Sequence, residues 1–125
     1  AKIIKIPLFV GKYDYRKWLK LTENFKWEKE GGIRCKLCFN IRLFSTALFA
    51  SKEKFDCFAT TLSVSPHKDA DKINSSGYLA SQKTSISFYT ADFKKNNGFK
   101  KTMEMSRVYK IYRQNYCGCI YSVKK

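Results

Sequence analysis

Residues 55–73 read FDCFATTLSVSPHKDADKI and contain the transition that decides the fold class. The first eight residues are mostly apolar or β-branched, which predicts a buried strand over residues 55–62. Ser65 followed by Pro66 is typical of a helix N-terminus, because serine caps free backbone amides and proline fits the first helical position. This segment therefore predicts a strand that leads into a helix ending at about residue 83.

The alternation of strand and helix continues on both sides of this segment. Asp14 is a candidate helix cap near the N-terminus, and Gly31 and Gly32 interrupt the chain before a long helical pattern. Such an alternation indicates an α/β domain with a parallel sheet. The expected strands are residues 3–10, 55–62, 86–89 and 111–116, and the expected helices are residues 14–20, 34–52, 65–83 and 98–109.

A parallel sheet also implies where a ligand would bind. Ligands gather at the carboxyl ends of the strands, where the following helices begin. We therefore expect the start of the helix at residue 34 and the loops at residues 60–68 and 92–98 to share one edge. A last strand over residues 111–116 would return Cys117 to the same edge.

The chain is strongly basic. Its 125 residues predict one domain, and 25 Lys and Arg face 10 Asp and Glu, for a net charge of +15. This charge favours a polyanionic partner, above all nucleic acid, although lysine-rich surfaces also occur where they only confer solubility. No apolar run is long enough to span a membrane and no secretory signal is visible, so we expect a cytoplasmic protein.

Five cysteines without an export signal argue for thiolate chemistry or metal binding rather than a disulfide framework. Cys35 and Cys38 lie at a predicted helix start and face the same side, although a thioredoxin-type or a buried structural pair is also open. Cys117 and Cys119 flank a glycine, where metal ligation or a transient redox disulfide fits better than a strained structural bridge. The spacing of the pairs does not fit an ordinary zinc finger. Cys57 is expected to be a buried thiol outside the site.

The loop of residues 60–68 is a candidate phosphate site. It places hydroxyls and a lysine at a predicted helix N-terminus, where free amides and the helix dipole favour an anion. Plain capping by the serine explains the hydroxyls equally well. The candidate residues are Thr60, Thr61, Ser65, His67 and Lys68.

Two further stretches carry polar candidates. Asp92 begins a predicted loop, where its carboxylate suits a metal, a ribose hydroxyl or a simple turn. Residues 112–116 combine an arginine, two amides and two tyrosines, which can stack on and hydrogen-bond to an unpaired nucleotide. Arg113 and Gln114 are the nucleotide-binding candidates, because ordinary core packing explains them less well than it explains the tyrosines.

Four blocks of sequence together resemble a known family. The chain is similar to the C-terminal two-thirds of the cobalamin-independent epoxyqueuosine reductases of the QueH type, which would make residues 1–125 part of one such domain. Members of that family begin with a strand leading into adjacent cysteines, for which this sequence has no counterpart. The blocks are RCKLCF at 34–39, FDCFATTLSVSPHKDADKI at 55–73, ADFKKNNGFKK at 91–101 and YRQNYCGCIYS at 112–122.

The resemblance implies a Rossmann-like three-layer fold related to nucleotide α-hydrolases. It also implies an iron enzyme that reduces the epoxide of epoxyqueuosine at the tRNA wobble position, using a [4Fe-4S] cluster, an adjacent mononuclear iron and an electron donor, without cobalamin. Cys35 and Cys38 would be cluster ligands, with the remaining ligands in a missing or separately encoded N-terminal segment. Cys117 and Cys119 would serve the adjacent iron or form a redox pair.

The resemblance leaves the proton donor and the activity of this chain alone open. Tyr116, Asp92 or His67 would protonate the leaving oxygen, while Arg113 and Gln114 would hold the anticodon nucleotide. Two other functions stay open beside the reductase. One is an inactive or split RNA-binding fragment with an incomplete iron site, and the other is a thiol redox or zinc protein that uses the same cysteine pairs.

Overall fold

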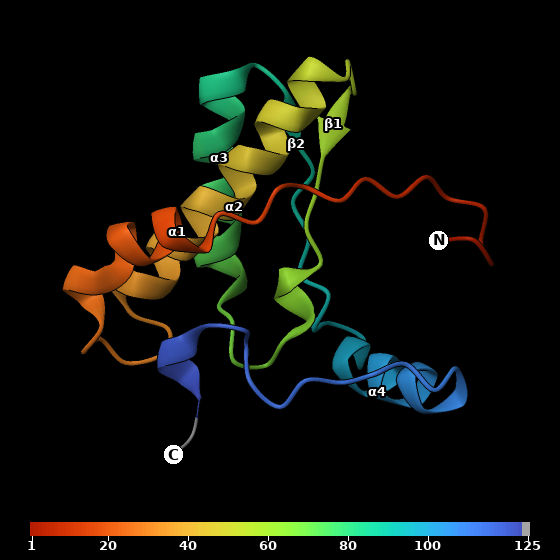
Figure 1. The fold of residues 1–125 in the computed structure, drawn as a ribbon. Coiled ribbons are helices and arrows are strands. Elements are labelled where there is room, and N and C mark those ends of the chain that lie inside the picture. The colour runs from red at the N-terminus through yellow and green to blue at the C-terminus, as the bar shows by residue number, and fades with distance from the viewer. Residues whose placement is uncertain (124–125) are drawn as a thin grey trace.

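The computed structural model describes residues 1–123 and is organised around two packed helices beside a small sheet (Figure 1). Helix α2 packs against helix α3 along the centre of the molecule, and strands β1 and β2 lie beside them. The architecture is therefore mixed helix and strand with a parallel sheet, compatible with the predicted α/β class. The elements are α1 (Tyr15–Thr22), α2 (Ile33–Lys52), β1 (Cys57–Phe58), α3 (Ala70–Thr84), β2 (Ser87–Phe88) and α4 (Gly98–Val108).

The core forms where α2, α3 and the sheet meet. Phe58 of β1 and Phe88 of β2 are opposite each other in the parallel register, with ring centroids 5.1 Å apart. Gly77 of α3 is buried against Phe88, and a Cβ atom there would lie 2.2 Å from a ring carbon. The absence of a side chain at Gly77 thus allows α3 to approach the sheet. The buried apolar residues of this cluster are Phe39, Leu43, Ala47, Ala50, Phe58, Ile73 and Ala80.

The first, second and last predicted helices are confirmed. Asp14 caps α1 by accepting a hydrogen bond from the Lys17 amide at 3.0 Å. Helix α2 starts one residue before the predicted position and ends at the predicted Lys52. Helix α4 starts at the predicted Gly98 and ends at Val108.

The predicted start of the third helix at Ser65 and Pro66 is wrong. Residues Leu62–Val64 form a short 3₁₀ turn, and α3 begins only at Ala70. Asp69 is the true cap, since its carboxylate accepts hydrogen bonds from the Asp71 amide at 2.8 Å and the Lys72 amide at 3.4 Å. Ser65 instead accepts a hydrogen bond from the His67 amide at 3.3 Å within a turn.

The sheet is smaller than predicted. The strands expected at 55–62 and 86–89 are present as the two-residue β1 and β2, whereas those expected at 3–10 and 111–116 are wrong. Residues 3–10 run over the surface, where Phe9 lies 5.2 Å from Phe49 between ring centroids. A strand needs a partner edge, and neither segment pairs with one in residues 1–123. A three-layer sheet is therefore not seen in this part of the chain.

The helices of the described region are too short or too polar to cross a membrane. This finding concerns residues 1–123 alone.

Candidate functional site

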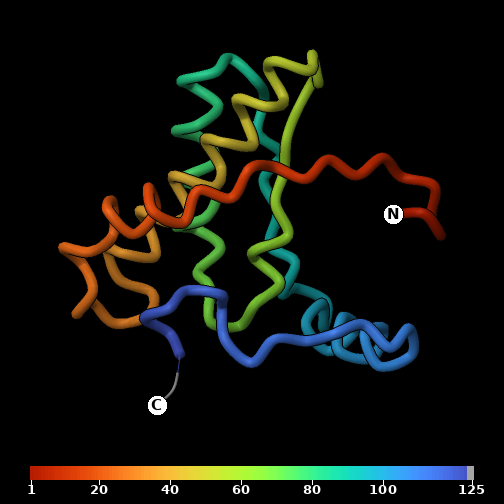
Figure 2. The backbone as a smooth tube through the Cα atoms, in the orientation of Figure 1, coloured from red at the N-terminus to blue at the C-terminus, as the bar shows by residue number. Residues whose placement is uncertain are grey.

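The C-terminal segment docks on α1 and α2. After α4 the chain runs back across the molecule to the turn between those helices, as Figure 2 shows. Tyr121 makes the contact, because its ring centroid lies 5.9 Å from that of Trp18 on α1. The Arg34 guanidinium in the first turn of α2 lies 5.1 Å from the same Tyr121 ring. One tyrosine thus joins the last described residues to both helices.

Two cysteines are held within this docked segment. The Ser122 hydroxyl donates to the Cys119 carbonyl at 2.7 Å and lies 3.2 Å from the Cys117 sulfur. Gly118 between the cysteines has a φ of +86°, a left-handed backbone conformation that glycine adopts readily. Both thiols are half-buried and free.

Arg34 is a buried cation without a carboxylate partner in residues 1–123. Its side chain belongs to a residue only 2% exposed, and one terminal nitrogen donates to the carbonyls of Phe25, Lys26 and Glu28. Its Nε atom is buried without a hydrogen-bond partner. Burying a charge without a partner of opposite sign costs free energy. An anionic group beside the guanidinium would reduce that cost.

The thiol of Cys119 is within electrostatic range of this cation. Burial raises the pKa of Cys119, and a backbone hydrogen bond involving Tyr121 opposes that shift. A negative charge on Cys117 raises the Cys119 pKa further, the Arg34 charge lowers it, and a negative charge on Cys38 raises it. The charge of Cys38 thus acts on Cys119 across the contact between α2 and the C-terminal segment.

The two cysteines of α2 follow a tight turn in the sequence. Cys35 and Cys38 are half-buried in the first turns of α2, and the Gly31 amide donates to the Cys35 sulfur at 3.2 Å. The Lys72 side chain donates to the Gly31 carbonyl at 2.8 Å, which ties this turn to α3.

A cavity of about 500 Å³ opens beside Cys119. Its walls come from residues 12–14, α1, α2 and the Gly118–Cys119 dipeptide. Five of its twelve lining residues are cationic or aromatic. They are Lys12, Tyr13, Lys17, Trp18 and Arg42.

A second hollow, of about 420 Å³, brings together His67, Lys68 and Asp92, which confirms the predicted proximity of the loops at residues 60–68 and 92–98, while the start of α2 does not line it. Lys94 closes it by donating to the carbonyls of Ser63 at 2.9 Å and Lys68 at 2.8 Å. The same amine lies 3.5 Å from the Asp92 carboxylate.

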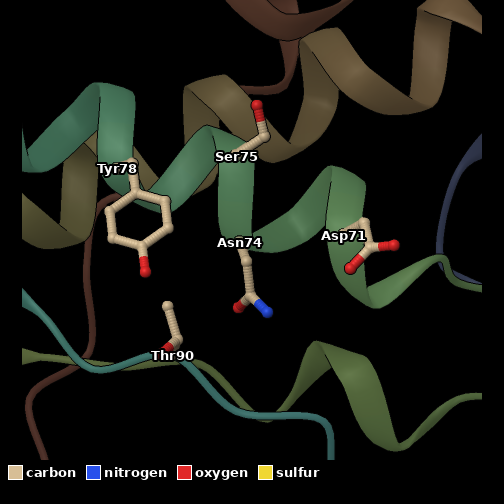
Figure 3. Close-up of a pocket in the computed structure, with 5 residues that line it drawn as sticks. All are labelled: Asp71, Asn74, Ser75, Tyr78 and Thr90. Carbon is tan, nitrogen blue, oxygen red and sulfur yellow. The ribbon is translucent and has the colours of Figure 1, made fainter.

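A third hollow, of about 510 Å³, lies between α3 and the chain after β2. Figure 3 shows Asn74 and Tyr78 extending from α3 toward Thr90, while Ser75 points away. The Asn74 amide donates to the Ala91 carbonyl at 3.4 Å. No site residue predicted from the sequence lines this hollow.

Thiol sulfur is chemically suited to iron, so the cysteines fit an iron site by donor type. Across residues 1–123, however, no three or more His, Cys, Asp or Glu side chains are placed to hold a metal ion. The described chain can therefore supply part of a ligand shell, and further donors would be needed to complete one.

Comparison with known proteins decides the family. The family model described as epoxyqueuosine reductase QueH matches residues 1–125. This chain belongs to the QueH family. Relatives named epoxyqueuosine reductase QueH are found in Streptococcus pyogenes, Staphylococcus aureus and Haemophilus influenzae, at 41%, 36% and 34% identity.

The chain spans about half the length of these curated relatives. The matches cover 90%, 98% and 99% of this chain but 44%, 50% and 51% of the relatives from Streptococcus, Staphylococcus and Haemophilus.

Several other predicted residues lie in local turns or at the surface. The Thr60 hydroxyl accepts a hydrogen bond from the Leu62 amide at 3.2 Å, and Thr61 precedes the 3₁₀ turn. Because α3 begins at Ala70, the predicted helix N-terminus is not at residues 65–68. The expected burial of Cys57 is wrong, since β1 exposes it and buries Phe58.

The nucleotide-binding candidates of residues 111–116 lie at the surface. Arg113, Gln114 and Tyr116 are exposed on an extended segment without strand pairing. The sequence reasoning missed Arg34 and the cavity at Arg42. The one available signal was an arginine directly before the first cysteine, while the cavity depends on contacts between distant parts of the chain.

Proposed function

We propose that this chain is the part of an epoxyqueuosine reductase that contributes cysteine ligands and substrate-binding surface. The reaction would reduce epoxyqueuosine at the wobble position of tRNA to queuosine. Membership of the QueH family supports the reaction, and the docking of the segment that contains Cys117 and Cys119 onto the start of α2, through Tyr121 and Arg34, supports its assignment to this site. The net charge of +15 suits a tRNA partner.

Iron–sulfur dependence is part of this proposal. Cys35 and Cys38 would hold a [4Fe-4S] cluster, and Cys117 and Cys119 would hold an adjacent iron or form a redox pair. The remaining donors would come from the part of the relatives that this chain does not span. Bound iron would supply Lewis-acid and electron-transfer chemistry.

Side chains of this chain would donate protons to the substrate and bind the tRNA phosphates. Removal of the epoxide oxygen as water takes two electrons, from an electron donor, and two protons. His67 and Asp92 share one hollow, where the imidazole or carboxyl would donate a proton, and the exposed Tyr116 hydroxyl is the alternative. Thr60, Thr61, Ser65 and Lys68 would contact phosphates, and Arg113 and Gln114 would contact the anticodon loop.

The proposal extends to the fold of the intact enzyme. We infer that β1 and β2 belong to a larger Rossmann-like three-layer sheet and that residues 1–125 form the C-terminal two-thirds of one cytoplasmic domain. The shortness of both strands and the exposure of Ile3, Leu8 and Val10, at 95%, 72% and 87%, support this extension.

The test uses the gene product that contains this chain, purified without oxygen and supplied with iron, sulfide and a chemical reductant. Epoxyqueuosine and queuosine in digested tRNA would be measured by mass spectrometry. We expect conversion, with loss of bound iron and activity in Cys38→Ser and Cys119→Ser. The exposed Cys57→Ser is the matched control and should retain both.

Two results would contradict the reductase. Zinc as the sole bound metal with unchanged epoxyqueuosine would favour a thiol or zinc protein. Binding of tRNA without iron or conversion would favour an RNA-binding fragment.

A further inference from the structure

The cavity beside Cys119 differs from the other two hollows in charge and in aromatic content. Lys12, Lys17 and Arg42 line it together with a single carboxylate, that of Asp14. The Asp14 carboxylate caps α1 through the Lys17 amide. The cavity is therefore the most cationic of the three hollows and suits an anion.

The second and third hollows lack this combination. Asp69, Asp71 and Asp92 line the second hollow beside two lysines, and no lysine or arginine lines the third. Neither has both an aromatic ring and an excess of positive charge. An RNA phosphate with its base fits only the first of them.

The aromatic rings of the first cavity have distinct surroundings. Trp18 is packed against Tyr15, with centroids 6.3 Å apart and planes 14° apart, and also contacts Tyr121. Trp18 is thus a fixed wall. Tyr13 is 77% exposed and contacts Tyr15 at 5.9 Å, which leaves its ring accessible to a stacking partner.

The remaining wall, on α2, carries two hydroxyl groups. Ser45 and Thr46 of α2 line the cavity near Arg42 and carry hydroxyl groups. Each hydroxyl already donates within α2, to the carbonyls of Ile41 at 2.9 Å and Arg42 at 3.0 Å, so each retains acceptor capacity. The volume of about 500 Å³ is within the range of small-ligand sites.

We infer that this cavity binds one unpaired ribonucleotide, with its base stacked on Tyr13 and an adjoining phosphate on Arg42, Lys12 and Lys17. The inference rests on the proposed function, since it places the nucleotide beside Cys119. Beside the proposed anticodon-loop contacts of Arg113 and Gln114, it adds a nucleotide site formed by the segment before α1, by α1 and by α2. Recognition of this kind depends on stacking and phosphate contact.

The experiment measures binding of a fluorescently labelled single-stranded RNA, five nucleotides long and unmodified, to the metal-free gene product by anisotropy. Tyr13→Ala is expected to weaken binding about 5- to 100-fold, the effect of losing one stacked base. Tyr13→Phe keeps the ring and should bind like the parent protein. Arg42→Gln should weaken binding and lower the slope of log affinity against log salt by about one, and Arg42→Lys should retain that slope.

Matched controls separate this cavity from general basicity. Tyr109→Ala and Arg107→Gln remove an exposed tyrosine and an exposed arginine at the end of α4, away from the cavity lining. They should leave the affinity within about twofold of the parent protein, because surface positions contribute little alone. Equal losses in the cavity and control variants, or unchanged binding in Tyr13→Ala, would overturn the inference.

The outcome is separable from that of the reductase test. RNA binding that depends on Tyr13, in a protein that leaves epoxyqueuosine intact, would support this site and contradict the reductase. Conversion of epoxyqueuosine with an unchanged KM in Tyr13→Ala would support the reductase and overturn this site.

Discussion

The Arg34 guanidinium lies 5.1 Å from the centroid of the Tyr121 ring, which places a buried cation directly under the C-terminal turn. The same guanidinium donates to carbonyls in residues 25–28. Arg34 thus connects the turn before α2 to the segment that carries Cys117 and Cys119. Its position suits both structural support and electrostatic complementarity to thiolates.

Arg34→Met should lower the free energy of unfolding by about 2–4 kcal/mol, because carbonyl groups lose a buried donor and the cation–π contact is lost. Urea unfolding would measure the change. Hydrogen exchange in residues 117–123 should rise as that segment loosens. Tyr121→Phe keeps the ring and is the matched control, and unchanged exchange in Arg34→Met would contradict the role given to Arg34.

Gly77→Ala should destabilise the fold by about 1–3 kcal/mol, because a Cβ atom 2.2 Å from the Phe88 ring forces the core to rearrange. Thermal and urea unfolding would measure the loss. Gly11→Ala is the control, since a Cβ atom there has nothing within 4 Å. A second change, Phe88→Leu, should recover part of the loss in Gly77→Ala, and equal stability of Gly77→Ala and Gly11→Ala would refute this packing.

Lys94→Met should cost about 1–3 kcal/mol of stability, since its amine joins two loops through the Ser63 and Lys68 carbonyls. Asp92→Asn should cost less than about 1 kcal/mol, because the Asp92–Lys94 ion pair at 3.5 Å is partly exposed and screened by solvent. Urea unfolding of both variants tests this order. A larger loss in Asp92→Asn would show that the ion pair, rather than the carbonyl contacts, holds the loops together.

Cys119 should be alkylated more slowly in the folded metal-free protein than in the urea-unfolded chain at the same mildly alkaline pH. Burial raises its pKa, so a smaller fraction is thiolate, and thiolate is the reactive form. The associated stability is present below the unfolded pKa and is lost as the pH rises through the folded pKa. Mass spectrometry after iodoacetamide pulses over a pH series would give the two midpoints.

The Arg34 charge lowers the Cys119 pKa, so Arg34→Met should move the folded midpoint to still higher pH. Coincident midpoints for the folded and unfolded protein would contradict the burial of this thiol. A downward movement in Arg34→Met, with hydrogen exchange in residues 117–123 unchanged, would contradict the electrostatic effect of the guanidinium.

The parts of the fold that were predictable have strong local signals. Asp14 caps α1 by contacts within its own turn, and α2 follows a pair of glycines. The start of α3 was misplaced because two capping signals compete within five residues. The Asp69 carboxylate accepts from two amides, whereas the Ser65 hydroxyl accepts from one.

The remaining features depend on contacts between distant residues. A strand requires a partner edge, which residues 3–10 and 111–116 do not find in the described chain. The burial of Arg34, for example, involves Tyr121 far along the chain. Likewise, the Ser63 hydroxyl accepts from the Phe93 amide at 3.1 Å, a contact that neither local sequence indicates.

Gly118 separates the two C-terminal cysteines at a φ of +86°, yet a Cβ atom there would have nothing within 4 Å. Space therefore does not restrict this position. Its restriction is one of chirality, because L-residues are disfavoured in the left-handed region while a residue of the opposite hand favours it. The achiral Cα of Gly118 thus permits the backbone turn that sets the relative direction of Cys117 and Cys119.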